Sequence, residues 1–167
     1  MKKIFFIFLF FSSQLFAQNN QFVRTYTNFA QKHVEVSGEG YVVGGIFMGQ
    51  ISLFKTDWSG NIVWAKRYSS GNSFADMKKL ADGGFVIAST NALLRTDSSG
   101  NVIWAKQYGN VSIITVDTAT GGGYILAGST SASPSVSKIF KTDSGGNIVW
   151  KKALKDVTYD RIYFPRA

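Results

Sequence analysis

The chain has 167 residues, of which 45% are hydrophobic and 15% aromatic, with seventeen glycines, two prolines and no cysteine. This composition predicts a globular chain rich in β-strands, and the missing cysteine excludes disulfides, thiol catalysis and cysteine-ligated metal sites from it. The formal net charge is +8, but the basic residues recur at fixed repeat positions and form no run, so nucleic acid is not predicted as a partner.

The first segment has the layout of an export signal. Residues 1–17, MKKIFFIFLFFSSQLFA, place Lys2 and Lys3 before an apolar run and end on the small residue Ala17. The run is too short to span a bilayer and is typical of a secretory signal peptide. No later segment is apolar and long enough for a transmembrane helix. We therefore expect residues 18–167 to be secreted or to reside at the cell surface.

The next predicted element is a lone strand at residues 22–26. Its sequence, FVRTY, matches WAKRY at 64–68 and WAKQY at 104–108, with Phe22 in the tryptophan position. Phe22 lies 42 residues before Trp64. We therefore expect this strand to be the last strand of a repeat whose earlier strands do not precede it.

The rest of the chain repeats two signatures in alternation. The first is a glycine turn followed by an aromatic and aliphatic residues: GEGYVVGG, DGGFVIAS and GGGYILAGS. The second reads KTDWSGNIVWAKRY, RTDSSGNVIWAKQY and KTDSGGNIVWKKAL. Trp64, Trp104 and Trp150 are separated by 40 and 46 residues. A period near 42 residues is the one expected for the blades of a β-propeller.

Each repeat is predicted to form a blade of four antiparallel strands. The predicted blades cover residues of about 29–68, 74–108 and 111–154. In the second blade, the strand at 85–89 is apolar at consecutive positions. This pattern predicts that both of its faces are buried, as they are in a blade packed between two others.

The second signature predicts a tight hairpin between the third and fourth strands. An aspartate at its start can accept hydrogen bonds from backbone N–H groups further along the turn, and a glycine fits the left-handed position that closes it. Beyond the turn, alternate residues from Ile62 to Tyr68 are expected on one face. The tryptophan on that face should wedge between blades and contribute about 3–5 kcal/mol. We assign structural roles to Asp57, Gly60, Trp64, Asp97, Gly100, Trp104, Asp143, Gly146 and Trp150.

The pattern of acid, small residue, glycine and tryptophan resembles the tryptophan-docking repeat of quinoprotein-like (PQQ-type) β-propellers. Together with the leader ending in LFAQ, the chain is similar to secreted β-propeller repeat proteins of Bacteroidota. The resemblance implies a scaffold without a known catalytic role. Closed propellers have four to eight blades. We therefore predict an incomplete propeller of three blades, with a lone N-terminal strand that completes the last blade of a ring and the start of a further blade at 155–167.

Two sets of residues are candidate ligand contacts. Lys55, Arg95 and Lys141 share one repeat position, and Lys66, Lys106 and Lys152 share another. Either set could form a basic ring on one rim that holds a polyanion, or could consist of solvated strand ends that pair with the repeated aspartates. Trp58 replaces the serine of the other two turns, and its exposed indole could stack on a sugar or a protein.

No catalytic, cofactor or metal site is predicted. A quinone site would need an acid outside the repeat register at the axis, for which Glu35 and Glu39 are the candidates. Calcium needs several carboxylates, whereas each turn offers one, and the single histidine, His33, is expected to be an ordinary strand residue. The sequence predicts a non-catalytic binding or scaffold protein whose partner is a glycan or surface protein and whose open blade faces self-associate. The alternative is an accessory module of a secreted polysaccharide-degrading or quinone-dependent enzyme.

Overall fold

The computed structural model describes residues 26, 29–69, 73–130 and 136–154. The predicted leader and the predicted further blade at 155–167 lie outside the described residues, and of the predicted lone strand only Tyr26 lies within them. The described residues form twelve β-strands, which pair into three four-stranded antiparallel sheets in chain order. The predicted all-β architecture of three blades is therefore confirmed.

Each blade is a meander of consecutive strands joined by short turns. Blade 1 contains β1 (Phe29–Ser37), β2 (Gly40–Phe47), β3 (Gln50–Thr56) and β4 (Ile62–Tyr68). Blade 2 contains β5 (Asp76–Lys79), β6 (Phe85–Ala88), β7 (Ala92–Thr96) and β8 (Val102–Gln107). Blade 3 contains β9 (Ser112–Thr118), β10 (Tyr124–Ser129), β11 (Ser137–Thr142) and β12 (Ile148–Leu154).

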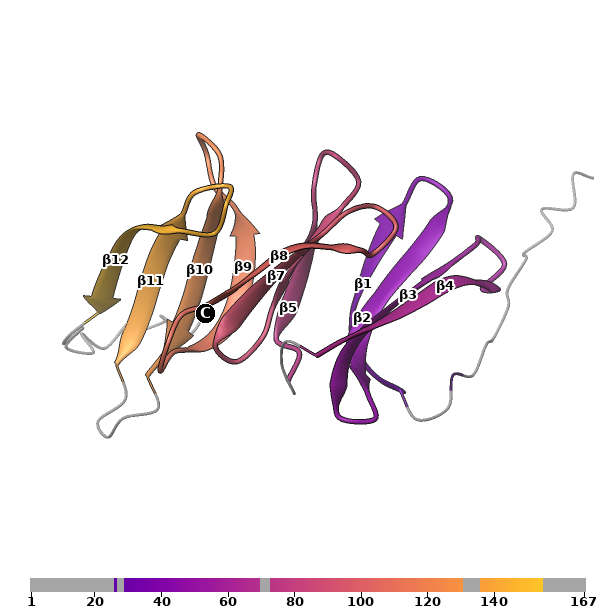
Figure 1. Cartoon of the computed structure of the whole chain (residues 1–167), viewed down its shortest axis with the longest axis horizontal. Helices are drawn as coiled ribbons and strands as arrows, with labels where there is room; N and C mark the ends of the chain where they lie inside the picture. The colour runs from indigo at the N-terminus through magenta and orange to yellow at the C-terminus, as the bar shows by residue number, and fades with distance from the viewer. Residues whose placement is uncertain (1–25, 27–28, 70–72, 131–135, 155–167) are drawn as a thin grey trace, which may run out of the picture.

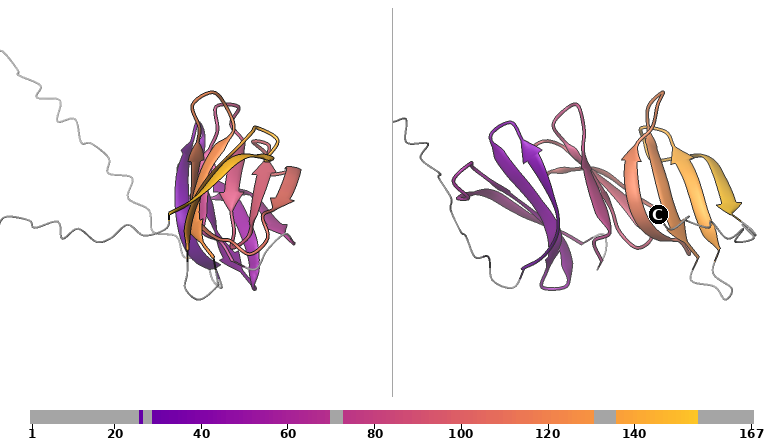
Figure 2. Two further views of the ribbon diagram at one scale, coloured as in Figure 1. Left: turned by 90° about the vertical axis from the view of Figure 1, so that its left-hand side faces the viewer. Right: turned by 180° about the vertical axis from the view of Figure 1, so that it is seen from behind.

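The blades stand side by side in chain order and converge at their first strands. Figure 1 shows them as a row with β4 near one end and β12 at the other, and in the view turned by 90° the three sheets lie one behind another (Figure 2). β5 contacts both β1 and β9, so the first strands occupy the inner edge. The fourth strands, which carry the repeated tryptophans, occupy the outer edge of the fan.

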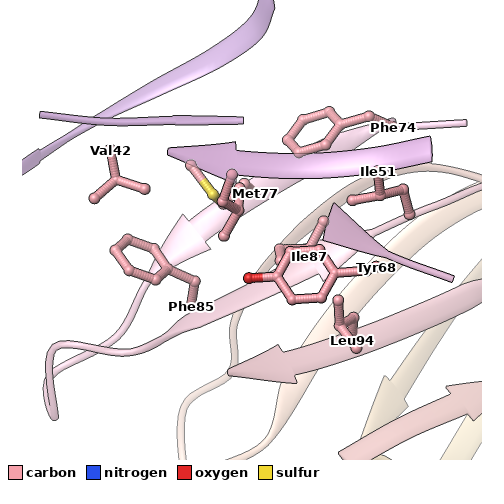
Figure 3. Close-up of a cluster of buried hydrophobic side chains, with 9 residues drawn as sticks. Val42, Ile51, Tyr68, Phe74, Met77, Phe85, Ile87 and Leu94 are labelled. Carbon is pink, nitrogen blue, oxygen red and sulfur yellow. The ribbon is translucent and has the colours of Figure 1, made fainter. Parts of the chain in front are cut away.

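The core lies between the blades. One cluster joins blades 1 and 2 and includes Val42, Phe85 and Ile87 (Figure 3). The other joins blades 2 and 3 and includes Val86 and Ala88. Successive residues of β6 therefore enter different clusters, and all four are at most 1% exposed. The prediction that both faces of this strand are buried is confirmed, because a neighbouring blade covers each face.

A β-bulge corrects one prediction about the fourth strand. Thr56 pairs with Ile62 and Lys55 with Trp64, so Val63 is the extra residue. Equivalent register shifts occur in the other two blades. A bulge reverses the side-chain alternation on its strand, so Ile62 and Trp64 lie on opposite faces and the predicted alternation from Ile62 was wrong. From Trp64 onward the alternation is regular up to Tyr68.

Candidate functional site

The repeated aspartates close the turn between the third and fourth strands. Asp97 Oδ1 accepts hydrogen bonds from the backbone N–H of Ser99 at 2.9 Å and of Asn101 at 2.8 Å, while Oδ2 accepts one from Asn101 Nδ2 at 3.0 Å. Asp57 and Asp143 bind the equivalent asparagines in the same way. Gly60, Gly100 and Gly146 have φ values of 77°, 77° and 79°, the left-handed region that glycine occupies without strain.

These hydrogen bonds make the turn sensitive to acid. The side-chain amide of Asn101, followed by its backbone N–H, lowers the pKa of Asp97, and Asn147 lowers the pKa of Asp143 in the same way. A lowered carboxyl pKa in the folded state stabilises the protein above the ordinary value of about 3.9, and this stabilisation is lost as the pH falls through the lower folded value.

We therefore expect Asn101→Ala to lower the midpoint of thermal unfolding more at neutral pH than in acid. The difference from the wild type should shrink below a pH of about 4, where Asp97 is protonated in the unfolded chain. Thermal melts from neutral to acidic pH test this expectation, with the exposed Asn110→Ala as control. A difference that stays constant over this pH range would contradict it.

Each fourth strand docks on the turn of the next blade. Tyr68 Oη donates a hydrogen bond to the carbonyl of Gly100 at 2.8 Å, and Tyr108 Oη donates one to that of Gly146 at 2.7 Å. A Cβ placed on Gly100 would lie 3.0 Å from the Trp64 ring. Burial, with a smaller effect of the Asp143 charge, raises the pKa of Tyr108 to about 12, so the hydroxyl keeps its donor proton at physiological pH.

The two halves of the repeated motif are thus complementary to each other. We call the side of a blade that carries the tryptophan its tryptophan face, and the opposite side its turn face. The tryptophan faces of blades 1 and 2 pack on the turn faces of blades 2 and 3, where Trp64 and Trp104 are half-buried against the two core clusters. Trp150 on blade 3 remains 39% exposed. The three predicted wedge residues therefore have two equivalent environments and one open one.

Tyr26 makes the same contact at the other end of the row. Its hydroxyl donates to the carbonyl of Gly60 at 2.8 Å, and its ring centroid lies 4.6 Å from that of Phe54. Tyr108 contacts Phe140 with a comparable separation of 5.3 Å. Tyr26 therefore takes, on blade 1, the place that Tyr108 takes on blade 3. This is the position that the alignment of residues 22–26 with the fourth strands predicts.

The three cations at the first repeated position are paired within their own blades. Lys55 Nζ lies 2.8 Å from Glu39 Oε2, and Lys141 Nζ donates to the carbonyl of Thr120 at 3.0 Å. Arg95 pairs with Asp82 and is only 7% exposed. The structure therefore shows neither of the two alternatives for this set, the basic ring or the pairing with the repeated aspartates. The pairing partners come from the hairpin between the first two strands and not from the repeated aspartates.

The second cation set lies between blades. Lys66 of blade 1 packs on Gly100 and Lys106 of blade 2 on Gly146, each with its Cγ about 3 Å from where a glycine Cβ would lie. Their charges help to lower the pKa of Asp97 and Asp143, which belong to the next blade. Lys152 on blade 3 lies 6.0 Å from the centroid of the Trp150 ring. Two of these lysines therefore belong to blade docking.

The first strands bring together polar residues that lie far apart in the sequence. His33 Nδ1 on β1 lies 3.2 Å from Asp76 Oδ1 on β5. Asp76 Oδ2 accepts hydrogen bonds from Thr115 Oγ1 at 2.7 Å and from the backbone N–H of Val116 at 3.0 Å, both on β9. Burial raises the pKa of Asp76, but the bonds from Thr115, Val116 and Met77 and the charge of His33 together lower it below the ordinary value.

A second polar row lies beside the first. His33 Nε2 lies 3.3 Å from Glu35 Oε1, and Lys78 Nζ lies 3.5 Å from Asp117 Oδ1. His33, expected to be an ordinary strand residue, thus faces one carboxylate with each ring nitrogen. Glu35 lies on the inner strand β1, whereas Glu39 lies in the turn between β1 and β2 and pairs with Lys55 on β3. Across the described ranges, no three His, Asp or Glu side chains are grouped so as to hold a metal ion.

These inner rows were not predicted from the sequence, because their members share no residue type. His33, Asp76 and Thr115 pair with Gly44, Ala88 and Ala127, which are equivalent positions of the second strands. Aligning the first strands through the glycine-turn signature would have placed the three side chains in one row. The rows link neighbouring blades at the inner edge, as the tryptophans do at the outer edge.

Trp58 forms an exposed edge on blade 1. Its side chain is 51% exposed, and its ring lies edge-on to Tyr41 with centroids 5.3 Å apart. A Cβ on Gly40 would lie 2.0 Å from the Thr56 carbonyl oxygen, so the two hairpins of the blade touch at this edge. Glu39, whose side chain is 83% exposed, lies in the turn that leads to Tyr41 and pairs with Lys55.

Comparisons with known proteins support the fold. No protein family and no curated protein matches the chain. The WD40 domain of Pan2 from Neurospora crassa matches with a TM-score of 0.57 and 14% identity, over 73% of this chain and 35% of that one. A Bacteroides caccae protein of unknown function matches with a TM-score of 0.51 and 17% identity, over 67% of this chain and 39% of that one. This chain thus spans less than half the length of either structure, and its blades are of the β-propeller type.

The quinoprotein-like assignment stays a prediction. No helix within the described ranges is long and apolar enough to cross a membrane.

Proposed function

We propose that this chain is an exported, non-catalytic propeller module that binds a glycan at the edge formed by Trp58, Tyr41 and Glu39. The observation that carries the proposal is the half-exposed indole of Trp58, held edge-on by Tyr41. The repeated aspartates, glycines and tyrosines are used in turns and blade docking, whereas Trp58 departs from the serine at the same position of the other two repeats. It is therefore available for a partner.

The chemistry of this edge suits a sugar. The exposed face of an indole packs against the C–H groups of a pyranose ring, and a neighbouring carboxylate accepts hydrogen bonds from its hydroxyls. Glu39, two residues before Tyr41 in the same hairpin, offers such a carboxylate, and its pKa is lowered by the hydrogen bond from Lys55 and by the Lys55 charge. Export to the cell surface is supported by the pattern of residues 1–17, and the resemblance to secreted Bacteroidota propeller proteins fits it.

Trp58→Ser tests the proposal with the residue that the chain itself uses in the other two turns. We expect the wild type to bind a subset of an array of neutral and anionic glycans, and Trp58→Ser to lose that signal while its unfolding midpoint stays nearly unchanged. Trp150→Ser removes the other exposed indole and should keep the signal. Silence of the wild type over the whole array, or equal binding by Trp58→Ser, would refute a glycan site at this edge.

A further inference from the structure

We propose that two copies of this chain close head to tail into a six-bladed ring, in which the tryptophan face of blade 3 of each copy docks on the turn face of blade 1 of the other. The proposal rests on the two blade junctions inside the chain and not on the glycan site. Tyr41 stands in the position of Phe85 on the turn face, so a docked second copy and a glycan would compete at Tyr41. It specifies the partner, a second copy, and the two surfaces that meet.

The tryptophan face of blade 3 has the composition of a buried junction but no covering blade in the described residues. On β10, the buried residues Tyr124 and Leu126 face blade 2, so Ile125 and Ala127 lie on the opposite face. Ile139 on β11 and Trp150 on β12 share that face. Ile125, Ala127 and Ile139 are half-buried and Trp150 is exposed. In an inner blade, the residues equivalent to the first three belong to the buried core.

The equivalent residues of blades 1 and 2 show what covers such a face. Val42 and Val86, which correspond to Ile125, are 1% and 0% exposed. Leu53 and Leu93, which correspond to Ile139, are also 1% and 0% exposed. In both cases the cover is the turn face of the next blade. The chain therefore contains two examples of the surface that fits the tryptophan face.

The turn face of blade 1 offers the same receiving surface a third time. Its Asp57–Gly60 turn has the geometry of the other two turns, and Phe54 stands in the position of Leu94. Tyr26 covers part of this face through its bond to Gly60 and its contact with Phe54. A groove beside Tyr26 is lined by Phe54, Ile62, Ala65 and Arg67 among others. A second copy must therefore displace Tyr26 to dock fully.

Geometry determines that the two faces meet between copies. They lie at opposite ends of the row (Figure 1), so they cannot contact each other within one copy. Because the blades converge at their first strands, the row curves around an axis. The described residues of two copies supply six blades, which falls within the range of four to eight for closed propellers. Each copy then uses both of its end faces, and the assembly stops at a dimer.

Charge substitutions on each face test the junction. Ala65 and Trp150 are exposed on the turn face and the tryptophan face, so Ala65→Glu and Trp150→Glu should fold, which circular dichroism checks. Sedimentation of the purified full chain should show a dimer for the wild type and monomers for both variants. Tyr26→Ala, which removes the competing side chain, should lower the dimer dissociation constant by about tenfold, equivalent to about 1.4 kcal/mol.

Mixing the two variants separates this junction from other modes of association. The Ala65→Glu copy retains an intact tryptophan face and the Trp150→Glu copy an intact turn face, so a mixture should form mixed dimers through one junction. A copy that carries both substitutions should not associate with either variant through that junction. A wild type that stays monomeric at high micromolar concentration, variants that still dimerise alone, a mixture that stays monomeric, or weaker association of Tyr26→Ala would each overturn the proposal.

Discussion

Trp104→Ala should lower the free energy of unfolding by about 3 kcal/mol, the lower end of the range for truncating a large aromatic residue in a core. Trp104 packs against the cluster between blades 2 and 3, its ring centroid lies 6.0 Å from that of Tyr124, and a Cβ on Gly146 would lie 2.9 Å from it. The lower end applies because part of the ring is exposed. Denaturant titration followed by circular dichroism gives the difference.

Two other tryptophans of the chain serve as matched controls. Trp58→Ala removes an indole that contacts Tyr41 at an exposed edge, so the loss should be about 1 kcal/mol or less. Trp150→Ala removes the residue equivalent to Trp104 from a face without a covering blade and should also cost little in a monomeric sample. Equal losses for Trp104→Ala and Trp58→Ala would refute the assignment of Trp104 to the blade junction.

The repeat made the architecture predictable from the sequence alone. Three copies of one motif located three equivalent hairpins, and the spacing of Trp64, Trp104 and Trp150 set the blade length. The chemistry of the turn followed from residue types, because aspartate caps backbone N–H groups and glycine accepts a positive φ. Consecutive apolar residues in β6 indicated two buried faces, because only a blade with a neighbour on each side buries both faces of its strands.

The contacts between repeats were less predictable, because each depends on the placement of strands that are distant in the sequence. The bulge at Val63 moved Ile62 to the other face, although the local sequence reads as a regular alternating strand. Arg95 is buried with Asp82 from another hairpin of its blade, and charge alone could not distinguish this from a solvated rim. The row of His33, Asp76 and Thr115 needs three first strands side by side.

The outer junctions and the inner polar rows both hold neighbouring blades together. The outer junctions repeat because every blade must offer the same tryptophan face to the same turn face, so their residues recur in the sequence. The inner rows do not repeat, since each position near the axis meets different neighbours. Unrepeated residues such as Trp58 and His33 are therefore specific to one blade of this protein, whereas the repeated residues determine how its blades stack.

The glycine before the aromatic residue of each blade is the position where one added methyl group should have the largest effect. A Cβ on Gly123 would lie 1.9 Å from the carbonyl oxygen of Thr142. The equivalent contacts are 2.0 Å between Gly40 and Thr56 and 2.2 Å between Gly84 and Thr96. In all three blades this glycine allows the second strand to approach the backbone at the end of the third.

We expect Gly123→Ala to lower the free energy of unfolding by about 2–5 kcal/mol, because it combines a left-handed backbone penalty of about 1–2 kcal/mol with overpacking of about 1–3 kcal/mol. Gly122→Ala is the matched control, since its φ of 90° is also left-handed but no atom lies within 4 Å of the added Cβ. It should therefore lower the free energy of unfolding only by the backbone penalty of about 1–2 kcal/mol. Hydrogen exchange should show the extra loss in blade 3, at the amides of β10 and β11. If the two variants unfold at the same denaturant concentration, the backbone approach does not limit this position, and the blade tolerates a methyl group on the third glycine of GGGY.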